Sequence, residues 1–130
     1  MLISHSQISK AQLVLKVSNI KVIEGTILYG LYNDPSVFLE DFKQFKTEAI
    51  KVETSTQLLY IDSIPAGVYA VSLFHDIDSD NKIAKNFFGI PKEPYGFSQN
   101  LKPMFKAPSF EDAKFEYDGV YKEIEIRLLD

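Results

Sequence analysis

Residues 68–74, VYAVSLF, decide the fold, because this stretch is apolar on nearly both of its faces. A short run of this kind predicts a central β-strand that is covered on both sides. Near the end of the chain, EIEIRL (123–128) alternates charged and apolar residues, as a half-buried strand does. Five further stretches show period-two or short apolar patterns: 12–18, 26–32, 47–53, 57–61 and 113–117. Seven short strands separated by turn residues predict an all-β fold, a single antiparallel β-sandwich with Greek-key character.

Two short helical pieces interrupt this pattern. In residues 34–42, Asp34 is a typical N-cap and Pro35 suits the first helical position, so Phe38 and Phe42 are predicted to form one aromatic stripe. The sequence SFED (109–112) predicts a single capped turn. The chain has 130 residues, which suits one domain over 1–130. Within it, we expect residues 1–10 to be flexible.

Composition excludes several classes of protein. The chain carries 14 basic and 18 acidic residues, a net charge of −4, which argues against nucleic-acid binding. No apolar run approaches the roughly 18 residues of a transmembrane segment. The absence of cysteine excludes disulfides, thiolate nucleophiles and cysteine-ligated metals. The first residues have neither the basic nor the apolar region of a signal peptide, so the protein is cytoplasmic or begins after a removed signal.

The stretch HDIDSDNKI (75–83) contains the clearest chemical motif. Its aspartates alternate as in the opening of an EF-hand-type calcium loop, in which a tight turn directs alternate oxygens onto one cation. The acid that normally closes such a loop is missing, so Asn86, or a carboxylate from elsewhere such as Glu93, Glu111 or Asp112, would have to substitute for it. Incomplete ligation predicts weak affinity, with a Kd of roughly 10⁻⁴–10⁻³ M. The alternative is an acidic, solvated turn. The candidate calcium ligands are Asp76, Asp78, Asp80, Lys82 (through its backbone carbonyl) and Asn86.

Residues 76–110 lie between two predicted strands and are rich in aromatic residues and proline. Compact domains rarely carry loops longer than about 15 residues without a reason, so function is sought here. The aromatic rings of this long loop can line a groove for a ligand, or they can belong to the core. His75 can act as a base or a ligand, or simply bond to the loop that follows it. The candidate ligand-binding residues are His75, Phe88, Tyr95 and Phe97.

Several stretches of the chain resemble the bacterial domain of unknown function 2141. They are IPAGVYAV (64–71), LFHDIDSDNK (73–82), NFFGIPKEPYGFSQN (86–100), APSFEDAKF (107–115) and IEIRL (124–128). The resemblance implies an immunoglobulin-like or transthyretin-like sandwich and a periplasmic or secreted location, and it implies no particular activity. Members commonly show HDxNxNGKLD at the acidic loop. This chain has Asp78 and Asp80 where the family usually has Asn, and it departs at Asn81, where the family has Gly, and at Ala84, where it has Asp.

Three functional hypotheses follow. The leading one is a non-enzymatic extracytoplasmic module that binds a partner protein, a glycan or a small ligand through residues 76–110, with calcium stiffening the loop. The second is a hydrolase that uses His75 with Asp76 or Glu93. The third is a purely structural accessory domain of the cell envelope, or one that assembles with copies of itself. The sequence leaves the ligand and the oligomeric state open.

Overall fold

The computed structural model describes residues 11–40, 42–78, 93–103 and 107–129. The predicted flexibility of residues 1–10 concerns a segment outside these ranges. The described elements include one short α-helix, α1 (Phe110–Ala113), and the 3₁₀ turns η2 (Pro35–Val37) and η3 (Ser98–Asn100). The described strands are β1 (Gln12–Ser18), β2 (Thr26–Tyr32), β3 (Lys46–Lys51), β4 (Gln57–Asp62), β5 (Gly67–Asp76), β6 (Tyr95–Phe97), β7 (Phe115–Tyr117) and β8 (Tyr121–Arg127).

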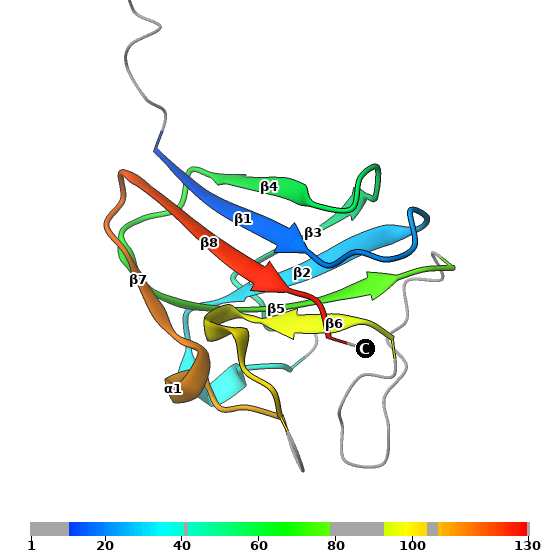
Figure 1. Cartoon of the computed structure of the whole chain (residues 1–130). Helices are drawn as coiled ribbons and strands as arrows, with labels where there is room; N and C mark the ends of the chain where they lie inside the picture. The colour runs from blue at the N-terminus through cyan, green and yellow to red at the C-terminus, as the bar shows by residue number, and fades with distance from the viewer. Residues whose placement is uncertain (1–10, 41, 79–92, 104–106, 130) are drawn as a thin grey trace, which may run out of the picture.

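The strands form two sheets that pack face to face as a sandwich (Figure 1). The three-stranded sheet has the order β4-β1-β8, and the five-stranded sheet has the order β3-β2-β5-β6, with β7 also paired to β5. The predicted all-β sandwich is therefore confirmed. The stretch 68–74 lies in β5, between β2 and β6, as its two apolar faces predict.

One strand pair departs from the predicted antiparallel arrangement. β1 and β8 run parallel, with Gln12 opposite Tyr121 and Ser18 opposite Arg127. Sequence periodicity fixes which face of a strand is buried, but it does not fix the direction of the neighbouring strand. The parallel pair brings the first and last strands of the described structure together.

The core lies between the two sheets and follows the period of two. The inward side chains recur at every second residue of the strands, and burying one of this size contributes about 1.5–3 kcal/mol. The core residues include Leu13, Leu15, Val17, Ile27, Tyr29, Leu31, Leu59, Ile61, Val71, Leu73, Tyr117 and Ile126.

A second, smaller cluster covers the outer face of the five-stranded sheet. Phe38 packs edge-on against Tyr32 and Phe110, with ring centroids 5.1 and 5.9 Å away. The helix predicted over 34–42 is shortened to η2, because Phe38 leaves the helical region (ψ 129°) and Phe42 has a φ of +66°. Phe42 is 96% exposed. The predicted aromatic stripe of Phe38 and Phe42 is therefore wrong.

The segment predicted as one long loop contains regular structure. Residues 95–97 form β6, which pairs with β5, and η3 follows directly. The predicted capped turn at 109–112 is confirmed: the Ser109 side chain accepts from the Asp112 backbone, and the Asp112 carboxylate accepts from the Ser109 backbone. Ser98, which is 1% exposed, donates to the Ala113 carbonyl at 2.6 Å and accepts from the Val71 N–H at 2.9 Å. These bonds fix the segment after β6 against β5 and α1.

Candidate functional site

The end of β5 brings three carboxylates together. The His75 N–H donates to the Pro94 carbonyl at 2.7 Å, next to the antiparallel pairing of β5 with β6. Glu93, which directly precedes Pro94, therefore lies beside the end of β5. One carboxylate oxygen from each of Asp76, Asp78 and Glu93 lies within 4.8 Å of the other two. We refer to these three residues as the carboxylate cluster.

The members of the carboxylate cluster differ in their exposure to solvent. Asp76 is 0% exposed, Glu93 is partly buried and Asp78 is exposed. Removing a carboxylate from water is costly, and a second negative charge nearby raises the cost of ionisation further. A hard cation reduces both costs, because it replaces the lost hydration and offsets the repulsion. The cluster is therefore chemically suited to hold such an ion, and Asp78 gives it a side that faces solvent.

The β1–β2 connection packs against the same end of β5. Gly25 has a φ of +72°, and a Cβ at this position would lie 2.1 Å from the Asp76 carbonyl oxygen and 2.5 Å from that of Ile77. No side chain fits there without moving the backbone that carries the carboxylate cluster. Thr26 lies directly opposite Asp76 in the β2–β5 pairing, so the two side chains share one face of the sheet. Thr26 Oγ1 is buried and has no hydrogen-bond partner among the described residues.

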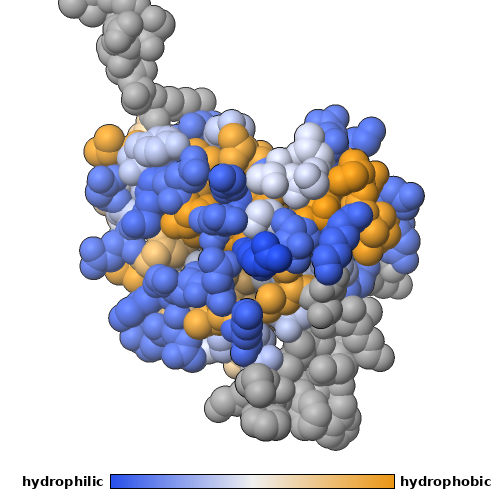
Figure 2. Space-filling model, viewed as in Figure 1, coloured by the Kyte–Doolittle hydropathy of each residue, from blue (hydrophilic) through white to orange (hydrophobic). Residues whose placement is uncertain are grey.

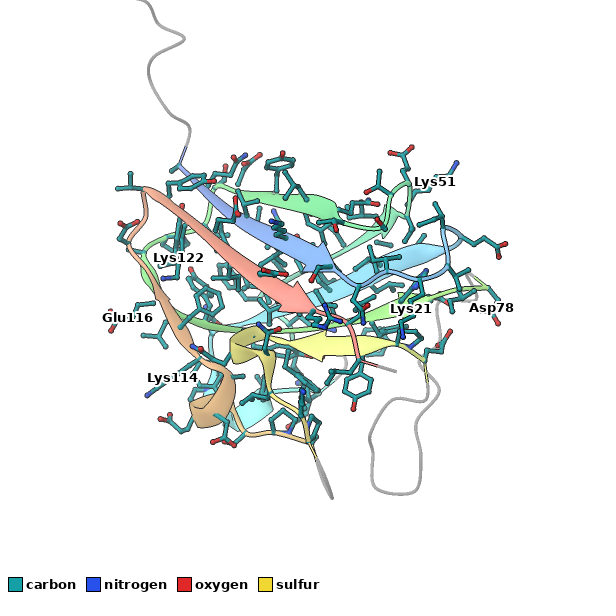
Figure 3. The ribbon with its side chains drawn as sticks, in the orientation of Figure 1. Lys21, Lys51, Asp78, Lys114, Glu116 and Lys122 are labelled. Atoms are coloured by element: carbon teal, nitrogen blue, oxygen red, sulfur yellow. The ribbon has the colours of Figure 1, made fainter. Side chains whose placement is uncertain are left out.

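The surroundings of this end combine a cationic residue with apolar surface. Lys21 and Asp78 lie at the same end of the molecule (Figure 3). The next residues of the β1–β2 connection, Val22 and Ile23, are 39% and 48% exposed. Figure 2 shows an apolar area at this end, on a face that is otherwise mostly hydrophilic.

His75 lies on the other face of β5, opposite the core residue Ile27, and is 1% exposed. Its Nε2 donates to the Glu24 carbonyl at 2.6 Å. Nε2 therefore carries the proton, because a carbonyl oxygen can only accept. Within the described residues, the ring thus bonds to the β1–β2 connection. The general base of a hydrolase must be able to reach its substrate. In this position the His75 ring is closed off from solvent.

The other candidate ligand-binding residues within the described ranges lie in β6. The rings of Tyr95 and Phe97 pack against each other with centroids 5.8 Å apart. Phe97 is 3% exposed and Tyr95 is partly buried, and burial raises the pKa of the Tyr95 hydroxyl. Of these two rings, only Tyr95 retains surface that a ligand can reach.

The sequence predicts only some of the residues of this site. Asp80, Lys82, Asn86 and Phe88 lie outside the described residues. Glu93, one of the three acids that could replace the missing ligand, lies with Asp76 and Asp78 in the structure. The other two named acids lie in α1: Glu111 pairs with Lys114 at 2.7 Å, and Asp112 closes the capping box. Gly25 is a typical turn residue, but nothing in the sequence places Gly25 or Thr26 beside the carboxylate cluster, because that placement depends on the register between β2 and β5.

Comparison with known proteins identifies one family. Residues 15–125 match the family described as "Uncharacterized protein conserved in bacteria (DUF2141)", and this span contains the whole carboxylate cluster. The resemblance noted in the sequence is thereby confirmed. No curated protein and no solved structure gives a significant match. Among the described residues, no helix has both the length and the apolar character needed to span a membrane.

Proposed function

The chain belongs to the bacterial family of domain of unknown function 2141, and we propose that it is a non-enzymatic β-sandwich module that acts outside the cytoplasm. In this proposal, Asp76, Asp78 and Glu93 bind a calcium ion, and the module binds a partner or ligand through residues 76–110. The observation that carries the proposal is the convergence of the three carboxylates.

The spacing of the carboxylate oxygens supports calcium. Calcium binds oxygen ligands at about 2.4 Å, so two oxygens on one ion lie at most about 4.8 Å apart. The three carboxylate oxygens of the cluster lie within 4.8 Å of one another. One ion can therefore reach all three with little rearrangement. Ligands that are all carboxylate oxygens favour a hard cation of this kind over a softer transition metal.

The three carboxylate ligands found among the described residues are consistent with a weak site and with an extracytoplasmic role. Calcium takes six to eight oxygen ligands, and sites that hold it weakly, with a Kd of roughly 10⁻⁴–10⁻³ M, are typical of extracellular modules. A site of this strength fills only where calcium reaches millimolar concentrations. Location and ion binding therefore support each other in this proposal.

A bound ion would add a link between the end of β5 and the start of β6, which already pair with each other. Asp76 ends β5 and Asp78 follows it, whereas Glu93 precedes β6. An ion held by all three carboxylates would stabilise the pairing between the end of β5 and the start of β6. A water on the ion would also give the buried Thr26 hydroxyl a partner. Ordering this end would prepare the partly exposed Tyr95 ring for contact with a partner.

Thermal unfolding in 5 mM calcium chloride and in chelator tests the ion site. With a Kd near 1 mM, binding only to the folded state adds about 1 kcal/mol, which raises Tm by roughly 2–6 °C. We expect this shift in the parent protein. It should be lost in Asp78→Asn and in Glu93→Gln, which remove one charged ligand each.

Glu40→Gln is the matched control, because it removes one exposed carboxylate of equal charge at the other end of the sheet. Asp76 pairs with Thr26 at the start of β2, whereas Glu40 lies in the connection that follows the end of β2. This control should keep the full shift. Equal shifts in all four proteins would mean that calcium acts through general screening, and no shift in any of them would reject the calcium site.

A further inference from the structure

A pocket of about 480 Å³ lies at the opposite end of β5 from the carboxylate cluster. The first residues of β5, the end of β7 with the turn after it, and the start of β8 line this pocket. A strand rises about 3.3 Å per residue, so Gly67 and Asp76 are about 30 Å apart. Figure 3 shows Glu116 and Lys122 at one end and Asp78 at the other. The volume is within the range of about 300–1,000 Å³ that is typical of small-molecule sites.

Tyr117, which lines the pocket, has a buried hydroxyl. The residue is 2% exposed, and its hydroxyl is buried with no hydrogen-bond partner among the described residues. Folded proteins rarely leave a buried hydroxyl in this state, because its lost hydration is not replaced. Its ring neighbour Tyr69, 6.4 Å away between centroids, donates its own hydroxyl to the Pro65 carbonyl at 2.6 Å. Of these two neighbouring tyrosine hydroxyls, only that of Tyr117 lacks a partner among the described residues.

Two carboxylates influence the Tyr117 hydroxyl without bonding to it. Burial raises the pKa of Tyr117, and the charges of Asp118 and Asp62 raise it further, so the hydroxyl stays protonated. Asp118 is held in place, because its Oδ1 accepts from the N–H groups of Val120 and Tyr121 at 2.8 and 3.2 Å. A ligand hydroxyl between Tyr117 and Asp118 could accept from the former and donate to the latter. Groups that do both are abundant in sugars.

The remaining lining residues suit the same kind of ligand. Tyr121 and Val68 are 50% and 41% exposed and offer apolar surface to the C–H groups of a sugar ring. Lys122 donates hydrogen bonds, and Glu116 accepts them. With Glu116 and Asp118 against Lys122, the lining is net negative, which disfavours phosphates and carboxylates.

We propose that this pocket binds a neutral saccharide, with the Tyr117 hydroxyl bonded to a sugar hydroxyl and the sugar ring packed on Tyr121. The site is separate from the carboxylate cluster and does not depend on calcium.

Titration of the 130-residue chain with glucose, galactose, mannose and N-acetylglucosamine, followed by amide chemical shifts, tests this proposal. At least one sugar should give saturable shifts, largest at Gly67, Val68, Tyr117, Asp118, Tyr121 and Lys122. Tyr117→Phe keeps the ring and should weaken the Kd about two- to tenfold, which corresponds to the loss of one hydrogen bond. Tyr60→Phe removes an exposed tyrosine hydroxyl that does not line the pocket, and it should leave the Kd unchanged.

Lys122→Gln provides a second variant that does not alter the core, and it should also weaken binding. Three results would overturn the proposal: no saturable shift with any of the four sugars, an unchanged Kd in both Tyr117→Phe and Lys122→Gln, or shifts centred on β6. Chelator should not alter the sugar Kd, which separates a failure here from a failure of the calcium site.

Discussion

Asn100 bonds to the backbone around Arg127 as a neighbouring strand would. Its Oδ1 accepts from the Arg127 N–H at 2.8 Å, and its Nδ2 donates to the Glu125 carbonyl at 3.2 Å. β8 is the outer strand of its sheet, so these two backbone groups are on an edge that could otherwise pair with another chain. The Asn100 side chain thus satisfies two backbone groups on this edge of the sheet.

Replacing Asn100 should weaken this edge. Asn100 has a φ of +51°, which asparagine tolerates better than most residues. We expect Asn100→Ala to lower the free energy of unfolding by about 1–3 kcal/mol, through two lost hydrogen bonds and backbone strain. Urea unfolding measures the loss, and sedimentation should show more self-association. Asn100→Gly removes the bonds without the strain, so a glycine variant as stable as the parent would show that the bonds contribute nothing.

Gly25→Ala should destabilise the protein and disturb the carboxylate cluster together. The added Cβ would meet the Asp76 carbonyl oxygen at 2.1 Å, at a φ of +72°. We expect a loss of about 2–4 kcal/mol in chemical denaturation, together with a reduced calcium-dependent rise in Tm. Gly67→Ala is the control, because its Cβ would meet only the Tyr69 ring at 3.7 Å. Equal effects of the two substitutions would contradict the close approach of Gly25 to β5.

Thr26→Val should leave stability in chelator unchanged or slightly higher. The buried Thr26 hydroxyl has no partner among the described residues, so its removal costs no hydrogen bond and relieves a desolvation cost of about 1–3 kcal/mol. With calcium present, the variant should gain less than the parent, since it cannot bond to a water on the ion. Thermal unfolding under both conditions measures this. A marked loss of stability in chelator would mean that the hydroxyl has a partner in solution.

The buried tyrosines should make the fold sensitive to alkaline pH. Burial raises the pKa of Tyr29, and so do its 2.6 Å hydrogen bond to Glu48 and the charges of Glu48 and Asp62. The folded state thus keeps the phenol proton after the unfolded chain has lost it. The contribution of this raised pKa to the free energy of unfolding is therefore fully present below about pH 10. Above that pH it falls, by up to about 1.4 kcal/mol per pH unit for one residue.

Tyr29→Phe separates these effects. It should lower stability at neutral pH, by about 1 kcal/mol, through the lost bond to Glu48. Above pH 10 its stability should fall less steeply than that of the parent. Urea unfolding at a series of pH values measures both effects, and identical alkaline slopes would show that Tyr29 ionises as easily in the folded protein as in the unfolded chain.

Local sequence patterns predict only part of the carboxylate cluster. Asp76 and Asp78 were found from their spacing alone, because alternate residues of a tight turn converge locally. Glu93 could only be named as one of several acids. Its selection depends on the pairing of β5 with the three-residue strand β6, which is too short to show a period. The burial of His75 likewise depends on the Glu24 carbonyl from another connection.

Local sequence patterns were enough to predict the sandwich, the capped turn at Ser109 and every described strand except β6, because these follow from alternation and from bonds between near neighbours. The tertiary structure alone decided the parallel pairing of β1 with β8, the place of Glu93 beside Asp76, and the pocket at Tyr117. Each of these depends on which distant backbone lies alongside, and that choice comes from the packing of the whole core rather than from any local pattern.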